Sequence, residues 1–134
     1  MLDELLQRLQ TDHLDLWQIH GVGFAGEPEE HFRKGGDAEA LLEAKQAGKV
    51  RYIGFTGHKS PEVHLRMLQS GSLSIPCRCR LNPFDAGFTH SFEKLLLPEA
   101  NKRGVAVLGM KPLGGSPEGI KQGVITADEA CATR

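Results

Sequence analysis

Hydrophobic and polar residues alternate with two different periods along this chain, and each period predicts a different kind of element. Residues 2–10 (LDELLQRLQ) have the period of a helix, and its apolar face would hold Leu2, Leu5, Leu6 and Leu9. Residues 14–20 (LDLWQIH) instead alternate between two sides, as a strand does. Three further strand patterns follow, at residues 50–57, 75–82 and 105–115. Helical patterns separate these strands, at residues 38–49, 62–70 and 92–103.

Capping residues and helix breakers mark where the helices begin and end. Asp37 is predicted to cap the first inter-strand helix, whose apolar face would hold Ala40, Leu41, Ala44 and Ala47. Ser60 followed by Pro61 is typical of the start of the second helix, and Ser91 of the start of the third. Pro98 falls inside the third pattern and should kink or restart that helix.

Strands that alternate with helices in this order are typical of βαβ units, which form a parallel sheet with helices outside it. Both doubly wound sheets and (β/α)₈ barrels are built in this way. No G-x-G-x-x-G turn follows a strand, which disfavours a Rossmann dinucleotide fold. Residues 21–36 are predicted to be a solvated loop because they carry glycines and a proline, and a last helix is predicted to begin at Thr126.

Composition narrows the class of protein further. The 134 residues carry a net charge of −1, which gives no reason to expect a nucleic acid or an anionic membrane as partner. We find no apolar run long enough for a membrane span and no signal-peptide pattern, and therefore expect a cytoplasmic protein. We treat residues 1–134 as one domain.

The cysteines and four of the histidines offer little chemistry by their spacing. There are three cysteines, an odd number that argues against a disulfide framework. Cys77 and Cys79 stand two apart, so they share a strand face; buried thiols are the simpler interpretation, with a metal or redox pair as the alternative. We expect the other histidines at the surface, namely His13, His31, His64 and His90.

Polar residues follow each predicted strand at the edge where parallel α/β folds bind ligands. His20 ends the first strand, Thr56, Gly57 and His58 the second, Asn82 the third, and Met110 and Lys111 the fourth. Each has a plain structural interpretation as well: a capped histidine, a strand hydroxyl, an Asn-Pro turn and a surface lysine. The functional interpretations are an imidazole donating to a carbonyl oxygen, a hydroxyl bound to a ligand amide, and a lysine on an anion.

Four segments in order resemble the aldo-keto reductases: LQTDHLDLWQIHG, GKVRYIGFTGH, LNPFDA and GVAVLGMKPLGG. The resemblance implies a (β/α)₈ TIM barrel, of which this chain would supply about half, as four strands with flanking helices. It also implies reduction of an aldehyde or ketone, with NADPH as cofactor and NADH left open. Hydride would pass to the carbonyl carbon, and a tyrosine hydroxyl would supply the proton.

The resemblance also assigns roles to individual residues. His20 falls on the histidine that orients the substrate carbonyl, and Thr56 on the position beside the nicotinamide carboxamide. Gly57 and Arg78 stand where the family usually has asparagine and glutamine, and Met110 where many members stack an aromatic ring on the nicotinamide. The loop near the pyrophosphate would be formed by Lys111, Leu113 and Gly114.

The family's catalytic aspartate, tyrosine and lysine lie on earlier strands that have no counterpart in this sequence. Tyr52 is the one tyrosine, and it falls early in its strand, at the wrong end for the site. The segment that grips the adenosine 2′-phosphate would follow Arg134. We therefore expect the chain alone to be inactive.

Two alternatives remain open at this point. One is a non-catalytic half-barrel module that binds a nucleotide or pairs with a complementary chain. The other is an unrelated half-barrel enzyme that uses His20 and Lys111 for phosphate or carbonyl chemistry. Because half a barrel leaves two open strand edges and an exposed inner face, we also expect the chain to be partly folded, aggregating or dimeric.

Overall fold

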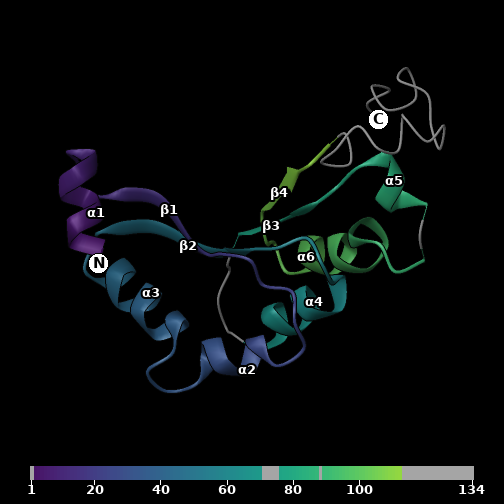
Figure 1. The fold of residues 1–134 in the computed structure, drawn as a ribbon, viewed down its shortest axis with the longest axis horizontal. Helices are drawn as coiled ribbons and strands as arrows, with labels where there is room; N and C mark the ends of the chain where they lie inside the picture. The colour runs from purple at the N-terminus through teal and green to yellow at the C-terminus, as the bar shows by residue number, and fades with distance from the viewer. Residues whose placement is uncertain (1, 71–75, 88, 113–134) are drawn as a thin grey trace.

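A computed structural model describes residues 2–70, 76–87 and 89–112 of the chain. Four strands form one parallel sheet in the order β1-β2-β3-β4, so that each strand pairs with its neighbour in sequence (Figure 1). The strands are β1 (Leu14–Ile19), β2 (Val50–Thr56), β3 (Cys77–Arg80) and β4 (Val107–Met110). All four predicted strands are therefore present, and each is shorter than its predicted range.

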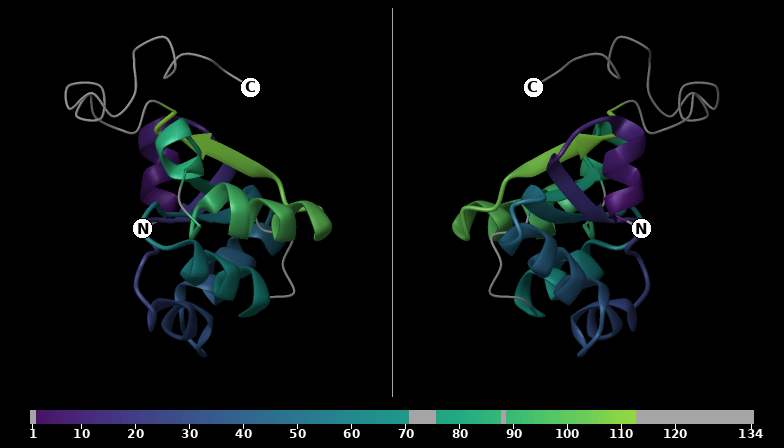
Figure 2. Two further views of the ribbon diagram at one scale, coloured as in Figure 1. Left: turned by 90° about the vertical axis from the view of Figure 1, so that its right-hand side faces the viewer. Right: turned by 90° about the vertical axis from the view of Figure 1, so that its left-hand side faces the viewer.

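Most helices lie on one face of the sheet, whereas the helix before the first strand lies at the amino ends of the strands and the short helix after β3 lies at their carboxyl ends (Figure 1 and Figure 2). The helices are α1 (Leu2–Leu9), α2 (Glu27–Phe32), α3 (Asp37–Gln46), α4 (Pro61–Ser70), α5 (Pro83–Ala86), the π-helix η1 (Phe92–Leu96) and α6 (Leu97–Lys102). The helix after Ser91 restarts at Leu97, next to Pro98, as that proline predicted. No helix in the described part of the chain is long and apolar enough to cross a bilayer.

The main core lies between the sheet and its helices. Phe55, Cys77 and Cys79 point from the strands into this layer and are almost completely buried. They pack against Met67 of α4 and Phe92 of η1, which are equally buried. Full burial of side chains of this size contributes about 1.5–3 kcal/mol each, so this layer holds the helices to the sheet.

The opposite face of the sheet has no helix over it among the described residues (Figure 1). Tyr52 lies on this face beside Leu16, its partner in the register of β1 and β2, and Leu108 lies there beside Arg78. Tyr52 is 52% exposed and Leu108 is 42% exposed. This uncovered face, with Leu16, Gln18, Tyr52, Thr56, Arg78 and Leu108, is the one that would line the inside of a closed barrel.

His64 corrects one prediction, because it is buried in the core rather than exposed at the surface. It lies on the face of α4 that also carries Met67 and Leu68, three and four residues later, and that face meets the sheet. The imidazole packs between Phe55 and Phe92, with both ring centroids 5.0 Å away. His13 and His90 are exposed as expected, and His31 is half-buried.

The segment after β1 corrects a second prediction, since it contains helix α2 rather than a continuous loop. Pro28 lies in the first turn of α2 and is buried. The Glu27 carboxylate accepts hydrogen bonds from the backbone N–H groups of Gly23 (2.6 Å) and Phe24 (2.8 Å). These bonds satisfy donors that would otherwise be free and fix the entry to the helix.

Smaller differences concern helix faces and one cap. Asp37 is the first residue of α3 and not its cap, which is Gly36, and its carboxylate is bonded to Nδ1 of His31 at 2.7 Å. Ala38 is buried on α3, whereas Ala40 and Ala47 are exposed. In α1 only Leu6 is buried, and Leu5 and Leu9 are exposed. The predicted helix at Thr126 lies outside the described residues.

Candidate functional site

The carboxyl ends of the four strands meet at one edge of the sheet, and backbone hydrogen bonds continue past the strands there. The N–H of Val22 donates to the Thr56 carbonyl at 2.9 Å, and the N–H of Gly57 donates to the Arg78 carbonyl at 3.0 Å. The N–H of Leu81 donates to the Met110 carbonyl at 3.2 Å. The residues predicted at separate strand ends therefore lie side by side along this carboxyl edge.

His20 stands directly after β1 and is exposed. Gly21 follows it with a φ of +82°, a left-handed conformation that favours glycine. Within the described residues the imidazole of His20 has no hydrogen-bond or acidic partner. The capped-histidine interpretation thus has no support here, and the ring nitrogens are available to a ligand.

Thr56 and Arg78 are neighbours in the register of β2 and β3, and both point to the uncovered face. Thr56 is 8% exposed, and its hydroxyl makes no hydrogen bond within the described residues. Arg78 is exposed and likewise has no bonded partner in that part of the chain. Both can therefore offer hydrogen bonds to a group lying on this face.

Gly57 has a structural reason to be glycine. A β-carbon at this position would lie deep inside the van der Waals radius of the Val22 carbonyl oxygen and 3.0 Å from Nε2 of His64. The backbone N–H of Gly57 is already used by the Arg78 carbonyl. Gly57 therefore contributes space and backbone shape to the carboxyl edge, rather than a donor.

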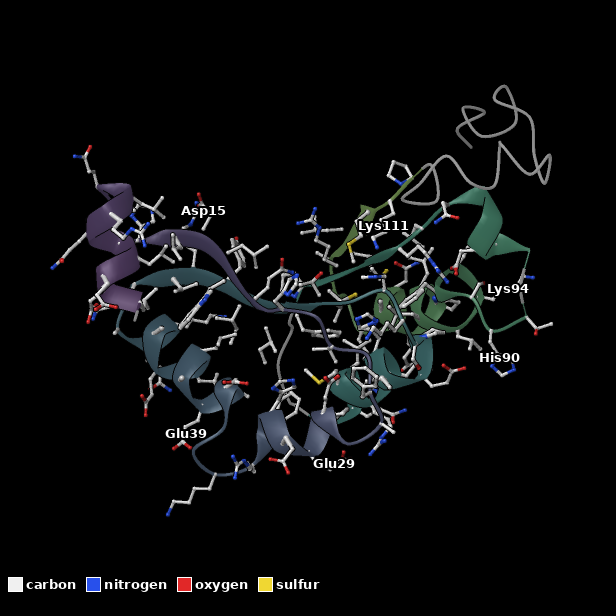
Figure 3. All side chains as sticks on the ribbon, viewed as in Figure 1. Asp15, Glu29, Glu39, His90, Lys94 and Lys111 are labelled. Carbon is white, nitrogen blue, oxygen red and sulfur yellow. The ribbon has the colours of Figure 1, made fainter. Side chains whose placement is uncertain are left out.

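Lys111 and Met110 end the fourth strand. Met110 is half-buried and is the register partner of Arg80. Lys111 adopts a φ of +55°, which costs a non-glycine residue about 1 kcal/mol. Figure 3 shows Lys111 far across the sheet from Asp15 at the start of β1. Leu113 and Gly114 lie outside the described residues, so their predicted role stays a prediction.

Two basic residues at the carboxyl edge received no role from the sequence. His58 is half-buried, and its pKa is lowered first by burial and then by the positive charges of Lys111, Arg80, Lys59 and His20. Arg80 lies next to the fourth strand end, because it is the register partner of Met110. The spacing in the sequence could have indicated both residues. Arg80 follows Arg78 by two residues and His58 follows Thr56 by two, and side chains two apart in a strand point to the same face.

This concentration of basic groups fits an anionic cofactor. Arg80 is paired with Asp85, but the described residues give Lys111 and Arg78 no acidic partner, and an anion beside these like charges would lower the free energy of the site. A pyrophosphate group carries negative charge, and the carboxamide of a nicotinamide would suit the Thr56 hydroxyl, which has no partner among the described residues. The donor set at the carboxyl edge is therefore compatible with a nicotinamide dinucleotide.

Asn82 has the turn role that its position before Pro83 predicted. Its Oδ1 accepts the Asp85 N–H at 2.9 Å and caps α5. The Asp85 carboxylate, which is 1% exposed, accepts two bonds from Arg80 at 3.0 and 2.6 Å and one from the Phe92 N–H at 2.9 Å. The turn after β3 thus fixes the side chain of Arg80.

Metal chemistry finds no support in the described residues, where no three metal-ligating side chains gather. Cys77 and Cys79 are free and buried, and a hydrogen bond between the thiols lowers the pKa of Cys77 and raises that of Cys79. Cys131 lies outside the described residues. A shallow depression between α1 and Lys49 lies at the amino edge of the sheet, opposite the carboxyl edge.

The comparisons with known proteins agree with this arrangement. The model of the aldo/keto reductase family matches residues 1–122. Protein tas of Escherichia coli is 30% identical over 128 residues, which cover 84% of this chain and 36% of that protein. This chain therefore spans little more than a third of the length of that relative.

Solved structures show the same fold. The holo form of an aldo-keto reductase from Bacillus halodurans matches with a TM-score of 0.61 and 29% identity, covering 79% of this chain and 32% of that one. The Bombyx mori aldo-keto reductase in complex with NADP matches with a TM-score of 0.59 and 21% identity, covering 82% and 34%. The expected fold, part of a (β/α)₈ barrel, is confirmed, and an unrelated half-barrel enzyme is ruled out. The chain belongs to the aldo/keto reductase family of oxidoreductases.

Proposed function

We propose that this chain carries the carbonyl-facing histidine and part of the nicotinamide site of an NADPH-dependent reductase that converts an aldehyde or ketone to an alcohol. The observation that supports it most is the carboxyl edge itself. Four strand ends bring His20, Thr56, Arg78, Met110 and Lys111 together there, and the described residues leave the polar ones without partners. NADH is the alternative cofactor, because none of the residues named here is assigned to the 2′-phosphate.

Each residue has a defined task in this proposal. When bound, NADPH supplies a hydride to the carbonyl carbon of the substrate. The His20 imidazole donates a hydrogen bond to the carbonyl oxygen, which orients the substrate and stabilises negative charge that develops there. The Thr56 hydroxyl binds the carboxamide, with Arg78 beside it, and the Met110 thioether lies against the nicotinamide.

The pyrophosphate is proposed to lie at the end of β4. The ammonium group of Lys111 neutralises part of its charge there, and Leu113 and Gly114 continue the same loop. Gly57 takes part through the space that it leaves rather than through its N–H, which the Arg78 carbonyl occupies. The small-molecule carbonyl substrate would enter beside His20.

Proton donation sets the limit on what this chain does alone. Tyr52 is the one tyrosine, and it precedes Thr56 by four residues, or about 13 Å along the strand. It cannot reach a carbonyl held by His20. Since a positioned general acid contributes about 10²–10⁴-fold to rate, we propose that these 134 residues by themselves have no appreciable reductase activity.

A second function rests on the same geometry. The free donors of the carboxyl edge suit a nucleotide whether or not a proton donor is present. A non-catalytic half-barrel module that binds a nucleotide, or pairs with a complementary chain, is therefore the alternative. It differs from the first proposal in needing no carbonyl turnover in any assembly.

Calorimetric titration tests the proposal. NADPH is titrated into the chain beside NADH, with ATP as an unrelated anionic nucleotide. Saturable NADPH binding that Lys111→Ala weakens by at least about tenfold, with Lys45→Ala on the far helix as control, would support the proposal. Equal binding of ATP, or no binding at millimolar NADPH, would overturn it.

A further inference from the structure

Three basic groups converge at the carboxyl edge beyond the positions that the family pattern marks. Arg80 pairs in register with Met110, so its side chain lies beside the residue that precedes Lys111. His58 follows Gly57, whose N–H is bonded to the carbonyl of Arg78. The N–H of Leu81, the residue after Arg80, donates to the Met110 carbonyl at 3.2 Å, so the chain after Arg80 stays beside the residue before Lys111.

Arg80 is held rigidly by a buried carboxylate. Its Nε and Nη2 both donate to Oδ1 of Asp85, and the guanidinium carbon lies 6.0 Å from the ring centre of Phe92. The third guanidinium nitrogen, Nη1, has no bonded partner within the described residues. Because the side chain is 35% exposed, this nitrogen can donate to a ligand without breaking the existing ion pair.

The charge of this region is not balanced by the described part of the chain. Asp85 is engaged by Arg80 and by the Phe92 N–H, and Lys111 has no acidic partner there. Asn82 adds an unmet donor, since its buried side-chain nitrogen has no acceptor among the residues that the structure describes. A buried donor without an acceptor is destabilising, so an acceptor oxygen that reached the Asn82 amide would be favoured.

We propose that Arg80, Lys111 and His58 form a subsite for an oxyanion, a carboxylate or phosphate group, with Asp85 holding Arg80 in place. Arg80 and Lys111 supply charge-assisted donors, which are about twice as strong as neutral ones. His58 supplies a neutral imidazole N–H, in keeping with its lowered pKa. The strained backbone of Lys111 is explained by this use, since strain of this kind is commonly retained where a side chain must be aimed.

Two molecules could bring the oxyanion: the cofactor, through its phosphates, or a carbonyl substrate that carries an acidic group. The second source rests on the proposed function, whereas the subsite itself does not. If the substrate brings it, the enzyme favours acidic aldehydes or ketones over neutral ones.

The test measures binding of inorganic phosphate, NADPH and the keto acid pyruvate to the 134-residue chain and its variants. Lys111→Gly removes a charge and relieves the positive φ, so it should not destabilise the fold. The double variant Arg80→Gln/Asp85→Asn removes both members of the buried pair and leaves no unpaired charge. Arg51→Ala is the control, because it removes an arginine charge from an exposed pair with Asp15 (2.5 Å) at the amino edge.

We expect Lys111→Gly and the double variant each to weaken phosphate binding by at least about tenfold, with Arg51→Ala within about twofold of the parent. A loss of NADPH binding equal to the loss of phosphate binding would identify the cofactor as the source. A loss of pyruvate binding with NADPH binding unchanged would identify the substrate. Should the double variant fail to fold, Lys111→Gly decides.

Phosphate binding that is absent, or that a folded Lys111→Gly retains unchanged, would overturn the subsite. Phosphate binding without any NADPH binding would leave the subsite standing and remove the proposed function. The two proposals therefore fail separately.

Discussion

Gly57 lies directly beneath the carbonyl oxygen of Val22, so close that no β-carbon fits between them. The contact joins the end of β2 to the segment that follows His20, where the Val22 N–H also meets the Thr56 carbonyl. His64 closes the same position from the helix side. One glycine thus sets how closely His20 approaches the second strand end.

Substitution of Gly57 should therefore destabilise the chain. We expect Gly57→Ala to lower the free energy of unfolding by at least about 2 kcal/mol, because the clash is with backbone and cannot be relieved by a rotamer change. Urea denaturation measures this. Gly26→Ala is the control, since a β-carbon there meets nothing within 4 Å. Equal stability of the two variants would contradict the packing described here.

His64 should make stability depend on pH. Burial lowers its pKa from 6.5 to about 4, so between these values the unfolded chain binds a proton that the folded chain does not. Stability is then fully present above pH 6.5 and falls as the pH drops towards 4, by about 1.4 kcal/mol per pH unit and about 3 kcal/mol in all.

Chemical denaturation across this pH range tests the prediction. His64→Leu should abolish most of the slope, because no titrating group remains between Phe55 and Phe92. His90→Gln should keep the slope, since His90 is exposed and paired with Glu62 at the surface. A parent protein whose stability does not change between pH 6.5 and pH 5 would show that His64 is not held neutral in the core.

The uncovered sheet face predicts self-association of the chain as given. We propose that a second copy covers Tyr52 and Leu108, because both are largely exposed and lie on a face without helices. Strands β1 and β4 also end the sheet without a strand partner in the described residues. Sedimentation equilibrium should show a concentration-dependent dimer or larger species.

A charged substitution on that face distinguishes association through the sheet from non-specific association through other exposed apolar side chains. Leu108→Glu should shift the equilibrium towards monomer, whereas Leu9→Glu on α1 should not, although Leu9 is even more exposed at 55%. A parent chain that stays monomeric at all concentrations would refute the proposal.

Local signals in the sequence predicted the elements well. The alternation in residues 14–20 and 50–57 and the serine before Phe92 each depend on neighbours in the chain, and the structure confirms them. The placement of Thr56 and Lys111 at one edge followed from the general rule that parallel strands share their carboxyl ends.

Contacts between distant segments could not be predicted in that way. The burial of His64 depends on which face α4 turns to the sheet, and the need for glycine at position 57 depends on the Val22 carbonyl. Arg80 was missed because its partner, Asp85, meets it only after the turn at α5 forms. In the sequence these residues look like ordinary polar or glycine positions, because the contacts that give them their roles form only when the helices pack against the sheet.

The central claim is that the carboxyl edge binds a nicotinamide nucleotide, and amide NMR spectra recorded during an NADPH titration test it most directly. We predict saturable shifts confined to the strand ends, at residues 20–22, 56–58, 78–82 and 110–112. Shifts at the depression formed by Asp3, Gln7 and Lys49, or none at millimolar NADPH, would contradict the account.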